Sequence, residues 1–179
     1  MIRAQRGKGV AGGPTRYFGQ GFSPRGEKDR FVLPADFRAS VRAASGGDKL
    51  LCLDAHHKLP CLVGYGFDRT ETFDTLVHEE WEMAKAAHDA TFDRDERLGQ
   101  LAAFHSASFD DSGRFVLPGY LAEMAEVSDG LYFNGGSEMI TIWAPEKLFA
   151  MGPGWNAAKA KCRALMAEAA SGSRRGGRR

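Results

Sequence analysis

The chain is poor in cysteine and has no long apolar run, and both features narrow the class of protein. Its three cysteines among 179 residues are Cys52, Cys61 and Cys162. An odd number of cysteines in apolar or helical stretches favours reduced thiols over a disulfide framework. No segment approaches the roughly 18 consecutive apolar residues of a membrane span, so we expect no membrane partner. The basic N-terminus lacks the apolar segment of a secretory signal. These features predict a cytoplasmic protein.

Acidic residues are absent from both ends of the chain. Residues 1–25 carry five basic side chains and residues 171–179 carry four arginines, whereas residues 26–170 hold 15 basic and 23 acidic side chains. Basic ends on an acidic body indicate either a polyanionic partner or arms that only aid solubility. We expect a disordered basic arm at residues 1–15, which are rich in glycine, and a basic tail at residues 171–179.

The sequence also lacks a recognisable catalytic constellation. His78, His88 and His105 have no partner at the spacing of a known motif. The glycines in Gly7-x-Gly9-x-x-Gly12 formally match a dinucleotide fingerprint, but no strand precedes them and no βαβ unit surrounds them. We therefore expect no enzymatic activity, no catalytic residue, no cofactor and no small-molecule substrate.

The segment from Cys52 to Cys61 permits a zinc interpretation, because His56 and His57 lie between the two cysteines. The alternative is a hairpin with buried thiols, since both cysteines fall in strands whose leucine neighbours require a core. We expect the hairpin and no metal; zinc analysis of the purified protein separates the two interpretations.

The strongest internal signal is a pentapeptide that occurs twice. Arg-Phe-Val-Leu-Pro occupies residues 30–34 and again residues 114–118, an offset of 84 residues. An exact match of this length is improbable as an accident, and its offset is too long for a solenoid period. The repeat indicates a duplicated half-domain.

Each half has the pattern strand, turn, strand, short helix and hairpin. In the first half, residues 16–67, the strand through Tyr17, Phe18 and Phe22 is followed by a turn at 23–26, a strand at 31–33, a helix opened by Pro34 and a hairpin of 50–53 with 59–63. In the second half, residues 106–151, the strand at 107–109 is followed by a turn at 110–113, a strand at 114–117, a helix after Pro118 and a hairpin of 131–133 with 139–143. Apolar residues at helical spacing predict a helical connector at 68–105 and a last helix at 152–170, which packs on its own chain or on a neighbour.

A four-stranded unit of this size is marginal alone, so the two halves should interlock into one barrel. The sequence thus predicts a mainly β chain with flanking helices, of the α+β class, with pseudo-two-fold symmetry.

The second copy of the repeat carries a family resemblance. Asp110-Asp111-Ser112-Gly113-Arg114, followed by Phe-Val-Leu-Pro, resembles the Asp-x-x-Gly-Arg-x-x-x-Pro signature of the MraZ family. The resemblance covers about residues 17–151. It implies a swapped-hairpin, double-psi type β-barrel similar to AbrB, MazE and SpoVT, with two copies in one chain. It also implies a ring-like homo-oligomer that binds direct repeats in promoter DNA of the division and cell-wall gene cluster.

The first copy departs from the signature. Gly26 stands where the family has Asp, and Asp29 stands where it has Gly. The glycine position requires a positive φ, which Asp tolerates less well than Gly. Gly26 and Asp29 in the first copy, and Asp110 and Gly113 in the second, are the expected turn-forming residues.

The resemblance implies that Arg30 and Arg114 contact DNA. An arginine at the mouth of a tight turn can present its guanidinium to a phosphate or to a guanine, or it can cap its own turn by pairing with Glu27 or Asp110. We add Lys28 and Arg25 to the expected DNA contacts, because residues 22–42 have a net charge of +2 and residues 106–126 a net charge of −3. The first copy should carry more of the binding, since phosphate neutralisation dominates affinity.

The sequence therefore predicts a nucleoid-associated transcriptional regulator, expected to act as a repressor, with double-stranded DNA and its own copies as partners. The alternative is an antitoxin-like protein-interaction module that has lost DNA binding.

Overall fold

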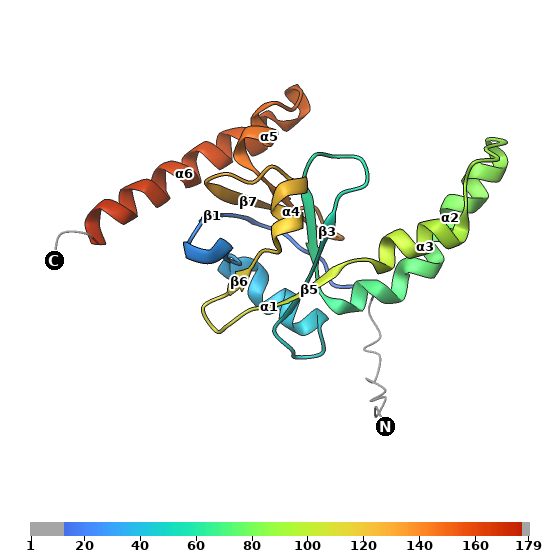
Figure 1. Cartoon of the computed structure of the whole chain (residues 1–179), viewed down its shortest axis with the longest axis horizontal. Coiled ribbons are helices and arrows are strands. Elements are labelled where there is room, and N and C mark those ends of the chain that lie inside the picture. The colour runs from blue at the N-terminus through green and yellow to red at the C-terminus, as the bar shows by residue number, and fades with distance from the viewer. Residues whose placement is uncertain (1–12, 177–179) are drawn as a thin grey trace.

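The computed structural model describes residues 13–176 (Figure 1). Most of the expected basic arm, residues 1–12, and the last three residues of the tail lie outside the described residues. Within them, Thr15 donates both its backbone N–H and its hydroxyl to Asp68 Oδ2, at 3.0 and 2.7 Å.

The fold alternates short strands with helices, as the repeated pattern predicts. In chain order the elements are β1 (Gln20–Pro24), η1 (Glu27–Asp29), β2 (Arg30–Val32), α1 (Ala35–Ala44), β3 (Leu50–Ala55), β4 (Leu62–Tyr65), η2 (Phe67–Thr72), α2 (Phe73–Ala86), α3 (Arg94–Ala102), β5 (His105–Ser108), β6 (Arg114–Val116), α4 (Gly119–Met124), β7 (Gly130–Gly135), β8 (Ile140–Trp143), α5 (Pro145–Phe149), η3 (Pro153–Trp155) and α6 (Asn156–Gly176). None of these helices is long and apolar enough to cross a bilayer.

The strands form one antiparallel sheet of six in the order β1-β7-β8-β4-β3-β5, and a separate ribbon of β2 with β6. The chain is therefore of the mixed α+β class. The sheet is open, because β1 and β5 each pair with one neighbour, so the expected closed barrel is not confirmed. The reason lies in β2 and β6, which have three residues each and pair with one another. Pro34 and Pro118 follow soon after them and provide no N–H for further pairing.

The two halves interlock by exchanging strands. β1 of the first half pairs with β7 of the second half, and β5 of the second half pairs with β3 of the first. The two hairpins also join through β4 and β8, where Val63 lies opposite Thr141. Each half therefore supplies the strand that extends the hairpin of the other.

Several boundaries differ from the sequence prediction. The first hairpin joins β3, which continues to Ala55, with β4, which spans 62–65 and not the expected 59–63, so Cys61 lies just before a strand and not within one. The strands expected at 31–33 and 107–109 begin earlier, at Arg30 and His105. β1 begins at Gln20, after Gly19 with φ of +101°, so Tyr17 contributes an isolated bridge to Ser137 and Phe18 lies outside the strand. The first turn falls at 27–29 and not at 23–26, because Ser23 is buried within β1 and its Oγ accepts the Val32 N–H at 2.8 Å. In the second hairpin Gly135 pairs with Ile140 and lengthens β7.

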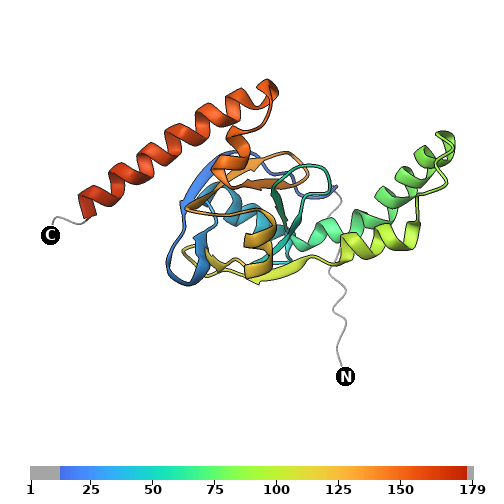
Figure 2. The same ribbon diagram turned by 45° about the horizontal axis from the view of Figure 1, so that its top comes forward.

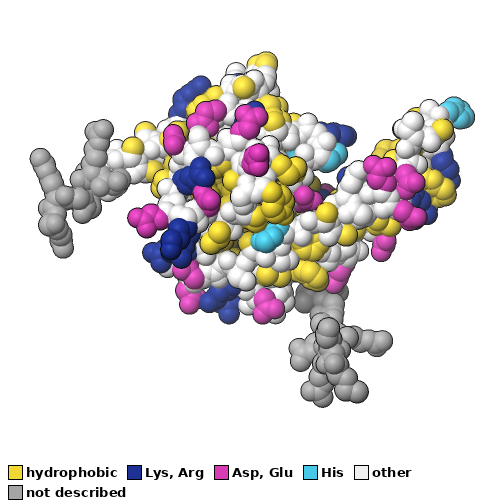
Figure 3. Space-filling view, viewed as in Figure 1, with side chains coloured by type: hydrophobic (Ala, Val, Ile, Leu, Met, Phe, Trp, Pro, Cys, Tyr) yellow, Lys and Arg dark blue, Asp and Glu magenta, His cyan; other side chains and the backbone are white. Residues whose placement is uncertain are grey.

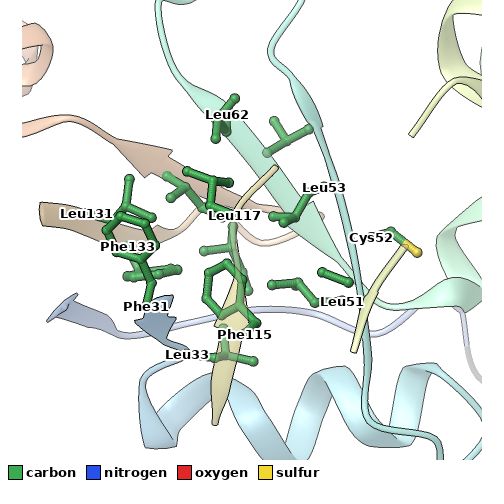
Figure 4. Packing of buried hydrophobic residues seen from close by; sticks show 14 of the residues in the cluster. Phe31, Leu33, Leu51, Cys52, Leu53, Leu62, Phe115, Leu117, Leu131 and Phe133 are labelled. Atoms are coloured by element: carbon green, nitrogen blue, oxygen red, sulfur yellow. The ribbon is translucent and has the colours of Figure 1, made fainter. Parts of the chain in front are cut away.

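The main core lies between the sheet, the ribbon, α1 and α4. Figure 4 shows its aromatic and aliphatic side chains converging from strands of both halves. Its largest fully buried members include Tyr17, Phe31, Phe37, Phe133, Leu33, Leu117 and Leu121. Because the members come from both halves, the core is shared between them.

A second cluster covers the outer face of β7 and β8. Tyr132, Trp143 and Cys162 are fully buried there, and Leu165 and Met166 of α6 pack against them. The last helix thus packs on its own chain, which is one of the two arrangements that its sequence allowed. It continues to Gly176, six residues beyond the expected end. Figures 1 and 2 show α6 and the α2–α3 pair extending from opposite sides of the central body.

The three cysteines are buried and are divided between the two clusters. Cys52 lies in the main core, whereas Cys61 and Cys162 lie in the second cluster. Two cysteines that point into separate cores cannot share a metal ion. Among residues 13–176 no group of three or more His, Cys, Asp and Glu side chains is placed to hold one.

Burial predicts slow thiol chemistry. It raises the pKa of Cys52 to about 11, of Cys61 to about 12 and of Cys162 to about 11. Since the thiolate is the reactive form, we expect all three thiols to resist a disulfide reagent in the native protein at neutral pH. In denaturant all three should react at once. Rapid titration of any thiol under native conditions would contradict the burial.

Candidate nucleic-acid interface

The two copies of the repeated pentapeptide pair with each other. In the β2–β6 ribbon Phe31 lies opposite Phe115, Arg30 opposite Val116, and Val32 opposite Arg114. Because side chains alternate between the two faces of a strand, both phenylalanines lie on one face and both Arg–Val pairs on the other. The repeat thus builds a small pseudo-two-fold unit at the point where the halves meet.

The inner face of the ribbon anchors it to the core. Phe31 and Phe115 are 1% and 2% exposed, and their ring centroids lie 6.2 Å apart. Phe115 also meets Phe133 of β7 edge to face. Figure 4 shows both side chains among other buried residues of the core, including Leu33, Leu117 and Phe133. The outer face therefore stands on a rigid support.

The outer face brings together two of the residues expected to contact DNA. Arg30 and Arg114 are exposed and line one shallow hollow of about 330 Å³, together with Ser108, Asp110 and Val116. Val116 is 52% exposed, so an apolar surface lies directly beside Arg30. The structure places Lys28 and Arg25 in the neighbouring first turn.

The second turn is closed by its own carboxylate. Asp110 Oδ1 accepts the backbone N–H groups of Ser112 and Arg114, each at 2.9 Å. These hydrogen bonds hold the pKa of Asp110 below its usual value, and the bond from the Arg114 N–H has the largest effect. Gly113 has a φ of +83° and donates its N–H to the Asp110 carbonyl at 2.8 Å.

The first turn keeps the same closure with different residues. The Gly26 N–H donates to the Arg30 carbonyl at 2.8 Å, as the Asp110 N–H does to the Arg114 carbonyl at 3.0 Å. Asp29 has the positive φ, +56°, that its place in the signature requires, and Lys28 adds a second, +58°. Two non-glycine residues in this region are uncommon and cost conformational energy.

Arg25 holds the first turn together. Its Nε donates to Asp29 Oδ1 at 2.8 Å, and its Nη1 donates to the carbonyls of Val127 and Ser128 at 3.2 and 3.0 Å. Its guanidinium is therefore bound within the protein. Lys28 is exposed and, among the described residues, has no ion pair.

The two principal arginines differ in their acidic neighbours. Arg114 Nη1 lies 3.7 Å from Asp110 Oδ2, an exposed ion pair of the kind that contributes little energy. Arg30 has no ion pair with Glu27 or with any other acid among residues 13–172. The turn-capping alternative thus applies in part to Arg114 and not to Arg30.

Each turn is also held by the other copy. The Leu33 N–H donates to the Gly113 carbonyl at 2.7 Å, and the Leu117 N–H donates to the Asp29 carbonyl at 3.0 Å. Gly113 and Asp29 occupy equivalent positions 84 residues apart and both have positive φ. The geometry of one copy therefore depends on the presence of the other.

One residue at the interface was given no role by the sequence. Arg38 of α1 reaches across to the second turn and donates its Nε to the Leu33 carbonyl at 2.7 Å. Arg38 lies one helical turn after Pro34, and this spacing is the local signal that could have indicated its contact with the Leu33 carbonyl. The position 84 residues later is Ala122, so comparison of the copies gave no support for it.

The cap of the second turn predicts a pH dependence. Because the folded-state pKa of Asp110 is lowered, the cap is complete above the usual Asp range and is lost as the pH falls through the lowered pKa. We expect amide exchange at Ser112 and Arg114 to accelerate there, after correction for intrinsic rates. Asp110→Asn keeps an acceptor oxygen without the charge and should abolish the step. Identical profiles in both proteins would contradict the assignment.

An apolar surface adjoins the ribbon. Tyr120 and Met124 of α4 are 52% and 62% exposed. In Figure 3 apolar side chains gather at the centre of the face, over α4, and basic side chains lie to their left, over the turn between β1 and β2. The corresponding positions of α1 are Asp36 and Ser40, so only the second half has this apolar surface.

Comparison with known proteins gives the class. No family model matches the chain. It is 31% identical over 121 residues to the transcriptional regulator MraZ of Gluconacetobacter diazotrophicus, which covers 66% of this chain and 72% of that protein. It is 29% identical over 120 residues to MraZ of Gluconobacter oxydans, covering 66% and 70%, and 27% identical over 121 residues to MraZ of Rhodospirillum rubrum, covering 68% and 74%. These relatives are named as transcriptional regulators, which sets the class of protein. The chain belongs to the MraZ family.

Proposed function

We propose that this chain is a DNA-binding transcriptional regulator and that the outer face of the β2–β6 ribbon contacts double-stranded DNA. The observation that carries the proposal is the exposed pair Arg30 and Arg114 on a ribbon anchored by Phe31 and Phe115. A two-stranded ribbon fits the major groove, where guanidinium groups reach phosphates and guanine edges. Lys28 adds a further exposed cation, whereas Arg25 acts on DNA less directly because its guanidinium is bound to the protein.

Membership of the family supports the finer proposal. The chain binds direct repeats in a promoter of the division and cell-wall gene cluster and represses it, in the cytoplasm and at the nucleoid. Several copies assemble into a ring, so that modest affinity per subunit is multiplied when repeat spacing matches subunit spacing. The exchanged strands support a relation to swapped-hairpin barrels. The proposal includes no catalytic step, cofactor or membrane partner.

A second candidate function is a protein-interaction module. The exposed Tyr120 and Met124 favour it, because an apolar surface beside the ribbon suits a protein partner.

The test is DNA binding by the full chain. Fluorescence anisotropy would compare the promoter fragment upstream of its own gene with a scrambled fragment, between about 50 and 200 mM salt. We expect a preference for the promoter and a linear fall of log affinity with log salt, at about 0.9 per phosphate contacted. Absence of binding to either fragment at the lowest salt would reject the regulator and leave the interaction module.

A further inference from the structure

We propose that Arg38 is a positioning residue of the interface: it fixes the second turn and thereby holds Arg114 in place for DNA. This inference rests on the proposed function and deepens it. It assigns a role to a side chain of α1 that lies outside the turn signature.

Leu33 links Arg38 to Gly113. Leu33 is fully buried at the end of β2, and its N–H donates to the Gly113 carbonyl. Its own carbonyl accepts the Nε–H of Arg38 at 2.7 Å. A buried carbonyl left without a donor costs about 1–3 kcal/mol. Arg38 therefore supports the residue that holds the second turn.

Arg38 also packs directly on the second turn. A Cβ atom placed on Gly113 would lie 2.3 Å from Arg38 Nε and 2.9 Å from its Cζ. The guanidinium thus occupies the space that a side chain at position 113 would fill. Gly113 is required both by its positive φ and by the approach of Arg38.

Arg38 also acts on the charge of the second turn. Asp110 forms an ion pair with Arg114 at 3.7 Å, and the charge of Arg38 also acts on its carboxylate. The positive charge of Arg38 contributes to the lowered pKa of Asp110, after the backbone hydrogen bonds and Arg114. Arg38 therefore adds positive charge beside the carboxylate that closes the second turn.

The two copies differ at the position of Arg38. Arg38 is replaced in the second copy by the buried Ala122, and none of the described side chains donates to the Leu117 carbonyl. The first turn instead uses Arg25, which joins Asp29 to the carbonyls of Val127 and Ser128. Loss of Arg38 should therefore impair the second turn and spare the first.

The decisive experiment is a pair of double-mutant cycles. DNA affinity of the full chain would be measured for Arg38→Ala alone and combined with Arg114→Ala or with Arg30→Ala. We expect Arg38→Ala to weaken binding by about tenfold, equivalent to one lost contact of about 1.4 kcal/mol. In the Arg114→Ala background the further loss should vanish; in the Arg30→Ala background it should persist. Arg38→Lys, which keeps the charge, should restore part of the affinity.

A matched control is Arg42→Ala, which removes another α1 arginine that donates to a backbone carbonyl, that of Gly47, at 2.9 Å. It should leave DNA affinity within about twofold of the wild type. The inference would be overturned if Arg38→Ala lowered DNA affinity equally in the Arg114→Ala and Arg30→Ala backgrounds. It would also be overturned if Arg38→Ala left DNA affinity unchanged while Arg30→Ala lowered it. Either result would leave the proposed function intact.

Amide exchange keeps the inference testable even if the protein binds no DNA. Arg38→Ala should accelerate exchange of the Leu33 N–H, which donates to Gly113, and leave the Leu117 N–H, which donates to Asp29, unchanged. Equal change at both, or at neither, would refute the positioning role independently of the proposed function.

Discussion

Replacing Arg30 by Ala is expected to weaken promoter binding by about tenfold or more, a greater loss than Arg114→Ala causes, since one good arginine–base contact is worth about 1–3 kcal/mol. Arg30 has no acidic partner among the described residues and lies beside Lys28, whereas Arg114 lies 3.7 Å from Asp110. An arginine already attracted to a carboxylate gains less from a phosphate. The measurement is an anisotropy titration of both variants at one fixed salt concentration.

The control is Arg94→Ala on α3, which removes a positive charge from the arm that extends away from the ribbon (Figure 2). It should change affinity little. Equal losses for Arg30→Ala and Arg114→Ala would show that the two copies contribute alike. A loss for Arg94→Ala as large as for Arg30→Ala would mean that general charge governs binding.

Gly113→Ala should be strongly destabilising, by about 2–4 kcal/mol, because strain at positive φ and overpacking each cost about 1–3 kcal/mol. The new Cβ would lie 2.3 Å from Arg38 Nε and 2.6 Å from the Leu33 carbonyl oxygen. In a chain of this size the melting temperature should fall by about 5–15 °C. Thermal unfolding followed by circular dichroism measures it.

Substitutions at two other glycines serve as controls that separate backbone strain from overpacking. Gly46 has a φ of +67°, and a Cβ atom added to it would have no neighbour within 4 Å, so Gly46→Ala should show the strain of positive φ alone, about 1 kcal/mol. Gly99 lies in α3 in open space, and Gly99→Ala should stabilise the helix by about 0.5–1 kcal/mol. If Gly113→Ala is no worse than Gly46→Ala, the close approach of Arg38 to the second turn is wrong.

Local signals in the sequence located most helices and turns. Pro34 and Pro118 precede helices, and Gly46 ends the first of them, because each of these residues restricts or permits particular backbone angles. The strand partners were not predictable in this way. β1 pairs with β7, more than one hundred residues away, and no local pattern specifies such a partner. The open sheet has the same origin, since nothing in residues 30–32 shows that they pair with 114–116.

Residues of the candidate site whose contacts are local in the sequence could be predicted, and residues whose contacts are distant could not. The roles of Asp110 and Gly113 follow from five consecutive residues, and the positive φ of Asp29 follows from its place in the repeat. Arg38 was missed because its partners, Leu33 and Gly113, belong to different halves. Arg25 was assigned to DNA from the positive charge of its segment, and its contact with Val127 and Ser128, about one hundred residues away, had no local signal in the sequence.

The reciprocal hydrogen bonds between the copies give the interface an order of assembly during synthesis. The residues of the first turn and of β2 have been made once Leu33 is added, yet the Asp29 carbonyl has no partner until Leu117, 84 residues after Leu33. At about 5–20 residues per second, that interval lasts about 4–17 s. A nascent chain therefore carries Arg30 without the ribbon that presents it. Under the proposed function, a product truncated before β6 would lack the paired ribbon, and with it the surface that we expect to compete for the promoter.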